Sequence, residues 1–271
     1  MEKQQLTQTN STRKVKGLNP FITIFIVIAI GELIYHFVFG APSNFIGDTT
    51  EGKPKTFMGI IHKGGVIVPF LVSFLLMVIV FSIERSFVIG KAGGTGSLTR
   101  FVNEIRKLLD KNEINDAIAL CDKQKGSIGN VVKEGLISYK SLAHDTTLDK
   151  EQKLVSLNKT LEEATTLEMP MLEKNMTILA TIASIGTLIA LMGTVIGMIK
   201  AFFALGDGGG SPDAAALSVG ISEALVNTAL GIGTSAFAII AYNFFTSKID
   251  TLTFKIDEVG LSIQQSFAAH H

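Results

Sequence analysis

Four long apolar stretches dominate the pattern of hydrophobic and polar positions along this chain of 271 residues. A helix needs about 20 apolar residues to cross a hydrocarbon core of roughly 30 Å, because each residue rises about 1.5 Å. Each stretch reaches that length, so the pattern predicts four membrane-spanning helices. They cover residues 20–40, 66–90, 176–205 and 219–245.

The longest polar segment, residues 91–175, separates the second span from the third. Its apolar residues recur at helical spacing, which predicts soluble helices. The last of these helices is expected to start near residues 145–148, and Pro170 is expected to bend it or reset its start. No strand alternation is found, so the fold class is an all-α membrane protein with a helical insert between the second and third spans. The first predicted stripe consists of Phe101, Ile105, Leu108, Leu109, Ile114, Ala117 and Leu120.

Basic residues at the edges of the spans predict the orientation of the chain. Arg13, Lys14 and Lys16 precede the first span, and such residues mark the cytoplasmic side. The first apolar stretch is longer than a signal-peptide core and no A-x-A-like site follows it, so a retained helix is favoured. The cytoplasm is therefore expected to hold residues 1–19, 91–175 and the helical tail 246–271, and the periplasm residues 41–65 and the Gly-rich turn 206–218.

Composition narrows the classes of function. The chain is 47% hydrophobic and its 24 Lys+Arg cancel its 24 Asp+Glu, which argues against binding nucleic acid in bulk. The single cysteine, Cys121, cannot form an intramolecular disulfide or supply a cysteine zinc site alone. No metal motif, cofactor motif or catalytic constellation is found, and GDGGGSP lacks the Lys-Ser/Thr of a phosphate loop. We expect a protein that is not an enzyme.

One carboxylate stands out in the fourth span. A charge at the bilayer centre costs roughly 2.5 to 3.5 kcal/mol, so a membrane carboxylate usually faces protein or water. A polar line along one helix side is what a proton or ion path across lipid requires. A carboxylate that only caps or anchors the helix near its outer end is the alternative. The line contains Glu223, Asn227, Gly231, Thr234 and Ser235, and Thr228 flanks it.

The third span carries a complementary pattern of hydroxyl and small residues. Small residues let helix backbones approach closely, and the glycines are interpreted mainly as packing positions. A single hydroxyl is weak support for a path because it often bonds its own helical turn, so the joint pattern of the two spans carries the hypothesis. The hydroxyls are Thr181, Ser184, Thr187 and Thr194, and the small residues are Gly186, Ala190, Gly193 and Gly197. In the first span Glu32 and His36 lie one turn apart and are expected to pair or to lie near the interface.

The motifs of these two spans resemble the MotA/TolQ/ExbB proton-channel family, closest to its ExbB-like branch. The third span reads L-A-T-I at residues 179–182 and L-M-G-T-V-I-G at residues 191–197. The fourth reads E-A-L-V-N-T-A-L-G at residues 223–231 and ends in Y-N at residues 242–243. Glu84-Arg85 also matches the family pattern, and the resemblance covers roughly residues 60–271.

The resemblance assigns roles residue by residue, with departures. Glu223 and Thr228 match the family's carboxylate and threonine in the last helix. Ile185 stands at the threonine position of the earlier helix and Thr187 at the following proline position, so Ser184 or Thr187 would have to supply a hydroxyl there. Phe237 stands at the proline position of the last helix, and the span at residues 20–40 is additional to the usual three.

The resemblance also implies an assembly and a location. Five such subunits would form a pore in the bacterial inner membrane, with a dimer of an ExbD-like one-helix protein inside it. That partner would bring a membrane aspartate, and proton entry would drive a TonB-like protein that energises outer-membrane transport. Two alternatives remain: a TolQ-like or MotA-like subunit with a different cargo, and a non-conducting membrane scaffold. The insert, residues 91–175, is smaller than MotA-type proteins usually carry and favours the ExbB/TolQ side.

Overall fold

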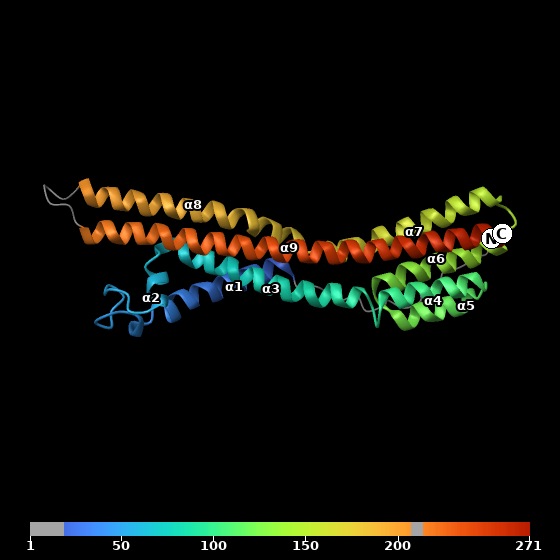
Figure 1. Ribbon diagram of the computed structural model, residues 1–271, viewed down its shortest axis with the longest axis horizontal. Helices are drawn as coiled ribbons and strands as arrows, with labels where there is room; N and C mark the ends of the chain where they lie inside the picture. The colour runs from blue at the N-terminus through green and yellow to red at the C-terminus, as the bar shows by residue number, and fades with distance from the viewer. Residues whose placement is uncertain (1–18, 207–213) are drawn as a thin grey trace, which may run out of the picture.

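The computed structural model describes residues 19–206 and 214–271, and nearly all of them are helical. The longest helix, α9 (Ala214–His270), runs along the whole length of the molecule (Figure 1). Helix α8 (Met176–Gly206) lies antiparallel to one half of it, and a helical domain packs along the other half. Four helices in the described part are long and apolar enough to cross a membrane. These features confirm the predicted all-α membrane fold.

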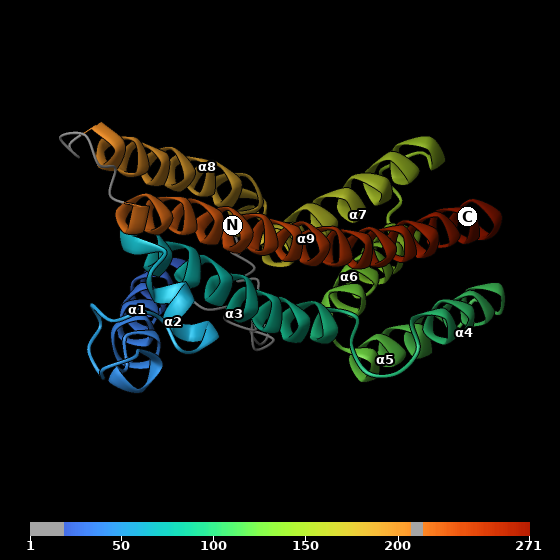
Figure 2. The ribbon, with the colours of Figure 1, turned by 60° about the vertical axis from the view of Figure 1, so that its left-hand side comes forward.

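The first two spans lie on the other side of α9 from α8 (Figure 2). Helix α1 (Pro20–Leu33) continues as a π-helical segment, Ile34–Phe39, and together they form the additional span. A connection with a 3-10 turn at Pro42–Asn44 and the short helix α2 (Phe57–His62) leads to a second 3-10 turn, Gly65–Ile67. Helix α3 (Val68–Ala92) then returns between α1 and α9. Large apolar side chains on the outside of these helices are exposed, as expected of surfaces that face lipid.

Four helices and the end of α9 form the helical domain: α4 (Leu98–Asp110), α5 (Ile114–Gln124), α6 (Gly126–His144) and α7 (Lys150–Glu173). The predicted stripe is buried at Phe101, Ile105, Leu109 and Ala117, but the chain breaks between α4 and α5. The break comes at Asn112, whose φ of 59° is left-handed. Sequence reasoning did not single out α6, which packs Tyr139 edge-on against Phe267 of α9.

Two helix boundaries differ from those expected. Helix α7 starts at Lys150 behind the capping box of Asp149 and Gln152, and it runs through Pro170. The chain breaks instead after Glu173, at Asn175, whose φ is 65°. Pro170 neither ends nor restarts the helix, although it has no N–H to donate to the carbonyl four residues earlier, and α7 ends within one turn after it. Helix α9 begins at Ala214, within the segment expected to be a turn, and continues without a break into the tail.

A buried ion pair fixes the junction between α3 and the helical domain. The guanidinium of Arg85 is fully buried and donates to both carboxylate oxygens of Glu84, at 2.6 Å each. It also donates to the backbone oxygens of Met171 and Leu172, at 3.3 and 3.1 Å. These carbonyls lie in the last turn of α7, where carbonyls lack partners within their own helix. The Glu84-Arg85 pair of the motif therefore caps α7 just before α8 begins.

The single cysteine lies in the core of the helical domain. Cys121 is 2% exposed, and burial raises the pKa of its thiol to about 12. The thiol is therefore protonated at neutral pH and has little of the thiolate character that reactivity requires. Its environment is that of a small apolar packing residue.

Candidate functional site

Three polar contacts bridge α8 and α9 in succession along their shared length. Near the ends joined by residues 207–213, the ammonium of Lys200 contacts both oxygens of Glu223, at 2.7 and 2.8 Å. Further along, the hydroxyls of Thr194 and Thr228 lie 2.5 Å apart. Beyond them, the hydroxyl of Thr187 donates to Ser235 at 3.0 Å. Antiparallel helices with the same rise bring together residues equally far from their connection, and this places each pair at one level.

Small residues let the two helices come close enough for these contacts. Residues Gly186, Ala190, Gly193, Gly197 and Gly231 are all buried along the same seam, as their predicted packing role requires. A methyl group on Gly231 would overlap Ala190, and one on Gly197 would lie 2.7 Å from the carbonyl oxygen of Gly220. The spacing of backbones is therefore set by the absence of side chains, as in other close helix pairs in membranes.

This packing predicts opposite results for two glycines of α9. Gly231→Ala should destabilise the protein by about 1 to 3 kcal/mol, because the methyl group overlaps Ala190 in a packed seam. Gly233→Ala meets open space and should stabilise the helix by roughly 0.5 to 1 kcal/mol. Thermal unfolding of the two purified variants in detergent gives the comparison. Equal midpoints would show that α8 and α9 are not in tight contact at this level.

Two polar side chains of the seam are almost completely buried. Glu223 is 3% exposed and Asn227, one turn further, is 0% exposed. Both atoms of the Asn227 amide lack a hydrogen-bond partner within the described residues. Gly193 faces this amide, and a methyl group there would lie 2.8 Å from Nδ2. Because a buried unpaired amide is costly, it marks a level of the seam where a water molecule or a transferred proton would gain a partner.

The predicted site residues do not all face the seam. Thr187, Thr194 and Thr228 belong to it, together with Glu223 and Asn227, whereas Thr234 is buried on α9 without a contact that joins it to α8 among the described residues. The exposed Ser184 of α8 does not belong to the seam. Of the two hydroxyls proposed to replace the family threonine, the structure therefore brings only that of Thr187 to α9.

Lys200 was not among the predicted site residues. Its signal was its charge: Lys200 is the one charged residue of α8, about as far from the connection as Glu223 on the other side. The lysine side chain is 51% exposed, whereas that of Glu223 is 4% exposed. The ion pair therefore has one open side, at Lys200. The half-buried Thr194 and Thr228 continue the partly open edge of the seam.

Other polar groups do not form a comparable site. Glu32 and His36 approach to 3.6 Å, as expected, and both side chains are largely exposed on the first span. Within the described residues, no group of three His, Cys, Asp or Glu side chains could hold a metal ion. Neither Glu32 nor His36 has a contact that brings it into the α8–α9 seam.

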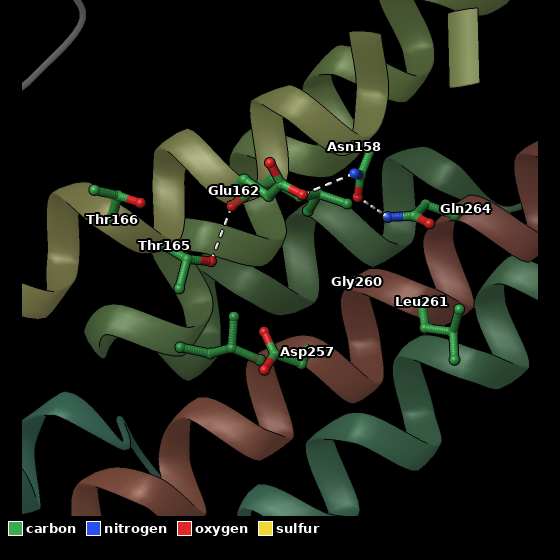
Figure 3. A pocket seen from close by; sticks show the side chains of 10 residues that line it. Asn158, Glu162, Thr165, Thr166, Asp257, Gly260, Leu261 and Gln264 are labelled. Carbon is green, nitrogen blue, oxygen red and sulfur yellow. Dashed lines mark hydrogen bonds between the residues drawn. The ribbon is translucent and has the colours of Figure 1, made fainter. Parts of the chain in front are cut away.

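A cavity of about 310 Å³ lies in the helical domain between α7 and α9 (Figure 3). Asn158 donates to Glu162 at 2.8 Å and accepts a hydrogen bond from Gln264 at 2.5 Å, which ties the two helices together. No His, Cys or Lys lines the cavity, and the hydroxyl of Thr165 donates to the backbone oxygen of Leu161 and not to a carboxylate of the lining. The seam between α8 and α9 remains the candidate site.

The sequence profile of the MotA/TolQ/ExbB proton channel family matches residues 124–258. This range contains α8, the first part of α9 and every polar pair of the seam. A relative from Neisseria meningitidis, "Biopolymer transport protein ExbB", is 30% identical over 159 residues, which are 57% of this chain and 71% of the relative. The chain belongs to the MotA/TolQ/ExbB family.

Two further relatives of this chain carry similar names. A "Biopolymer transport protein ExbB" from Xanthomonas campestris is 34% identical over 113 residues, which cover 41% of this chain and 44% of the relative. A "Putative biopolymer transport protein ExbB-like 3" from Synechocystis is 28% identical over 185 residues, covering 68% and 82%. The match thus spans less than half of the Xanthomonas protein. Together these findings identify a multi-pass membrane protein that is an ExbB-like member of a proton-channel family.

Proposed function

We propose that this chain is the ExbB-like subunit of a motor in the bacterial inner membrane that the proton-motive force drives. The observation that carries the proposal is the succession of polar pairs that bridges α8 and α9: Lys200–Glu223, Thr194–Thr228 and Thr187–Ser235. Carboxylate and hydroxyl groups can accept and donate protons, alone or through water. Such groups are costly to place in a membrane interior, so their presence there usually reflects a function.

The charge movement is large enough to drive a conformational step. Each elementary charge that crosses 100 mV releases roughly 2.3 kcal/mol, so one or two protons supply the energy of a modest rearrangement. The partly open edge of the seam, at Lys200, Thr194 and Thr228, is where a partner's acidic group would receive the proton. Both termini would lie in the cytoplasm, and the α8–α9 connection in the periplasm.

The proposed assembly is a homopentamer around an ExbD-like dimer with one membrane helix per subunit. The exposed apolar faces of α8 and α9 would be covered by neighbouring subunits, the partner helices and lipid. The motor would act on a TonB-like protein and energise transport across the outer membrane. The relatives' names, which describe biopolymer transport, support this cargo over the torque or envelope constriction of MotA-like and TolQ-like subunits.

Removal of the seam carboxylate tests conduction directly. Proton uptake is measured in vesicles that contain the chain and its one-helix partner under an imposed potential. Glu223→Ala should abolish uptake, because it removes the only carboxylate among the bridging pairs described above. Glu32→Ala removes another carboxylate of a membrane span, which is exposed and pairs with His36. It is the matched control and should retain uptake.

The same measurement separates conduction from a scaffold role. In a non-conducting scaffold the parent chain would give no more uptake than vesicles without protein, and Glu223→Ala would weaken assembly instead. Uptake that survives Glu223→Ala in an intact complex would remove Glu223 from the path.

A further inference from the structure

The additional first span ends next to the site. Its π-helical segment carries Tyr35, which is 9% exposed and lies in an apolar cluster with Val68 and Val72 of α3. Partly buried Val226 and Leu230 of α9 pack against the same cluster. Earlier in this span, Gly31 packs so closely on α3 that a methyl group there would overlap Ser73. The additional span is therefore fixed against α3, and through Tyr35 it reaches the apolar cluster against which α9 packs.

Tyr35 is bound to the turn between α2 and α3. Its hydroxyl donates to the backbone oxygens of His62 and Gly65, at 3.1 and 3.3 Å. Its ring stacks on the His62 ring, with centroids 4.6 Å apart and planes inclined by 14°. Burial lowers the pKa of His62, and Lys63 and His36 lower it further, so the stacked ring is uncharged at neutral pH. The same imidazole also contacts the ring of Phe45 in a T-shaped arrangement, with centroids 5.5 Å apart.

The turn that Tyr35 holds lies directly on Glu223. Gly65 has a φ of 77°, and a methyl group on it would overlap the Glu223 carboxylate. A methyl group on the preceding Gly64 would lie 2.7 Å from the side chain of Val226, the next residue of α9 on this face. The turn thus covers part of the carboxylate, in addition to the ion pair with Lys200. This explains why the side chain of Glu223 is 4% exposed although that of Lys200 is 51% exposed.

We propose that Tyr35 is a positioning residue for Glu223. The Tyr35 hydroxyl holds the Gly64–Gly65 turn, and the backbone of this turn lies against the carboxylate of Glu223. The turn thereby keeps the carboxylate directed toward Lys200 and closes the side that faces the α2 connection. The span that is additional to the family pattern then serves as a built-in cover over one end of the polar seam. The placement of the carboxylate follows from the contacts alone, and only its consequence for proton flow rests on the proposed function.

Chemical labelling of Glu223 tests the positioning. A carbodiimide labels the carboxyl groups that it can reach, and the turn and the pair with Lys200 leave the Glu223 side chain only 4% exposed and therefore slow to react. Membranes that contain the full chain are treated with the reagent, and the loss of unmodified Glu223 is followed by mass spectrometry. Tyr35→Phe keeps the ring stack but removes the hydroxyl, and it should accelerate labelling roughly 2- to 10-fold, the ratio that corresponds to a lost hydrogen bond.

A second variant acts on the turn itself. Gly65→Ala should accelerate the labelling of Glu223 at least as much, because the methyl group displaces the carboxylate. Gly47→Ala is the matched control: its φ of 85° is also left-handed, but a methyl group there meets open space. Tyr139→Phe, which removes a buried hydroxyl from the helical domain, controls for the loss of a tyrosine hydroxyl. Neither control should change the labelling rate of Glu223.

The outcomes separate the positioning from the function. Labelling of Glu223 at the parent rate in Tyr35→Phe overturns the role of Tyr35, even if Gly65→Ala accelerates it. Should Gly65→Ala fail to reach the membrane, Tyr35→Phe alone decides. Proton uptake of the same variants with the one-helix partner is measured in parallel. If labelling responds as expected but the parent takes up no protons, the positioning stands and the proposed function fails.

Discussion

Thr228→Val should reduce proton uptake by the assembled complex by about 100-fold or more, the scale on which a positioned proton-transfer group acts. The hydroxyl of Thr228 is the α9 half of the middle bridge, 2.5 Å from that of Thr194. Valine has nearly the same size, and Thr194 keeps its bond to the backbone oxygen of Ala190 at 3.1 Å. Stability should therefore fall by only about 1 kcal/mol. Uptake into vesicles and the mass of the purified complex measure the two effects.

Thr251→Val is the matched control for this prediction. It is the same substitution in the same helix, but its exposed hydroxyl bonds the backbone oxygen of Ser247 in its own helix. We expect uptake close to that of the parent. Normal uptake in Thr228→Val would take this threonine out of the path, and loss of assembly would indicate that the bridge serves packing.

Arg85→Leu should destabilise the protein by about 3 to 5 kcal/mol, the usual cost of removing one partner of a buried ion pair. The substitution leaves the carboxylate of Glu84 buried without its two short hydrogen bonds. It also leaves the last carbonyls of α7, at Met171 and Leu172, without their donor. The midpoint of thermal unfolding in detergent, compared with that of the parent, measures the loss.

An exposed arginine provides the comparison. Arg100 pairs with Glu104 at 2.8 Å one turn along α4, and its side chain is 81% exposed. Arg100→Leu should leave the unfolding midpoint close to that of the parent, because water solvates both charges when the pair is absent. An Arg85→Leu midpoint as high as that of Arg100→Leu would mean that the buried pair does not hold α7 to α3.

The seam shows how far sequence patterns reach. The spacing of Glu223, Asn227 and Thr234 predicted one polar side of α9; all three are buried, and the first two contact α8. The glycines of α8 were predicted to allow close packing, and they do. Periodicity within one helix does not state what that side contacts, however. The pairing of this side with α8 of the same chain required the antiparallel register of the two helices.

Lys200 and Ser184 illustrate the same limit from opposite directions. Both lie in α8, and the sequence motif made Ser184 a candidate site residue but did not include Lys200. A serine is attractive by its chemistry, but in the helix it lies on the exposed face. The lysine is the partner of Glu223 because it lies at the same level of the seam. The rotation of α8 about its own axis determines which of the two residues faces α9.

Sequence alone determined the number of spans, the helical insert and the polar side of the last helix, because hydrophobic length and helical periodicity are local properties of the chain. The tertiary structure decided which polar groups meet: Lys200 with Glu223, Arg85 with the end of α7, and Tyr35 with the turn over the carboxylate. These contacts join residues far apart in the chain. They depend on helix register, rotation and breaks such as that at Asn175, which packing selects among many locally acceptable arrangements.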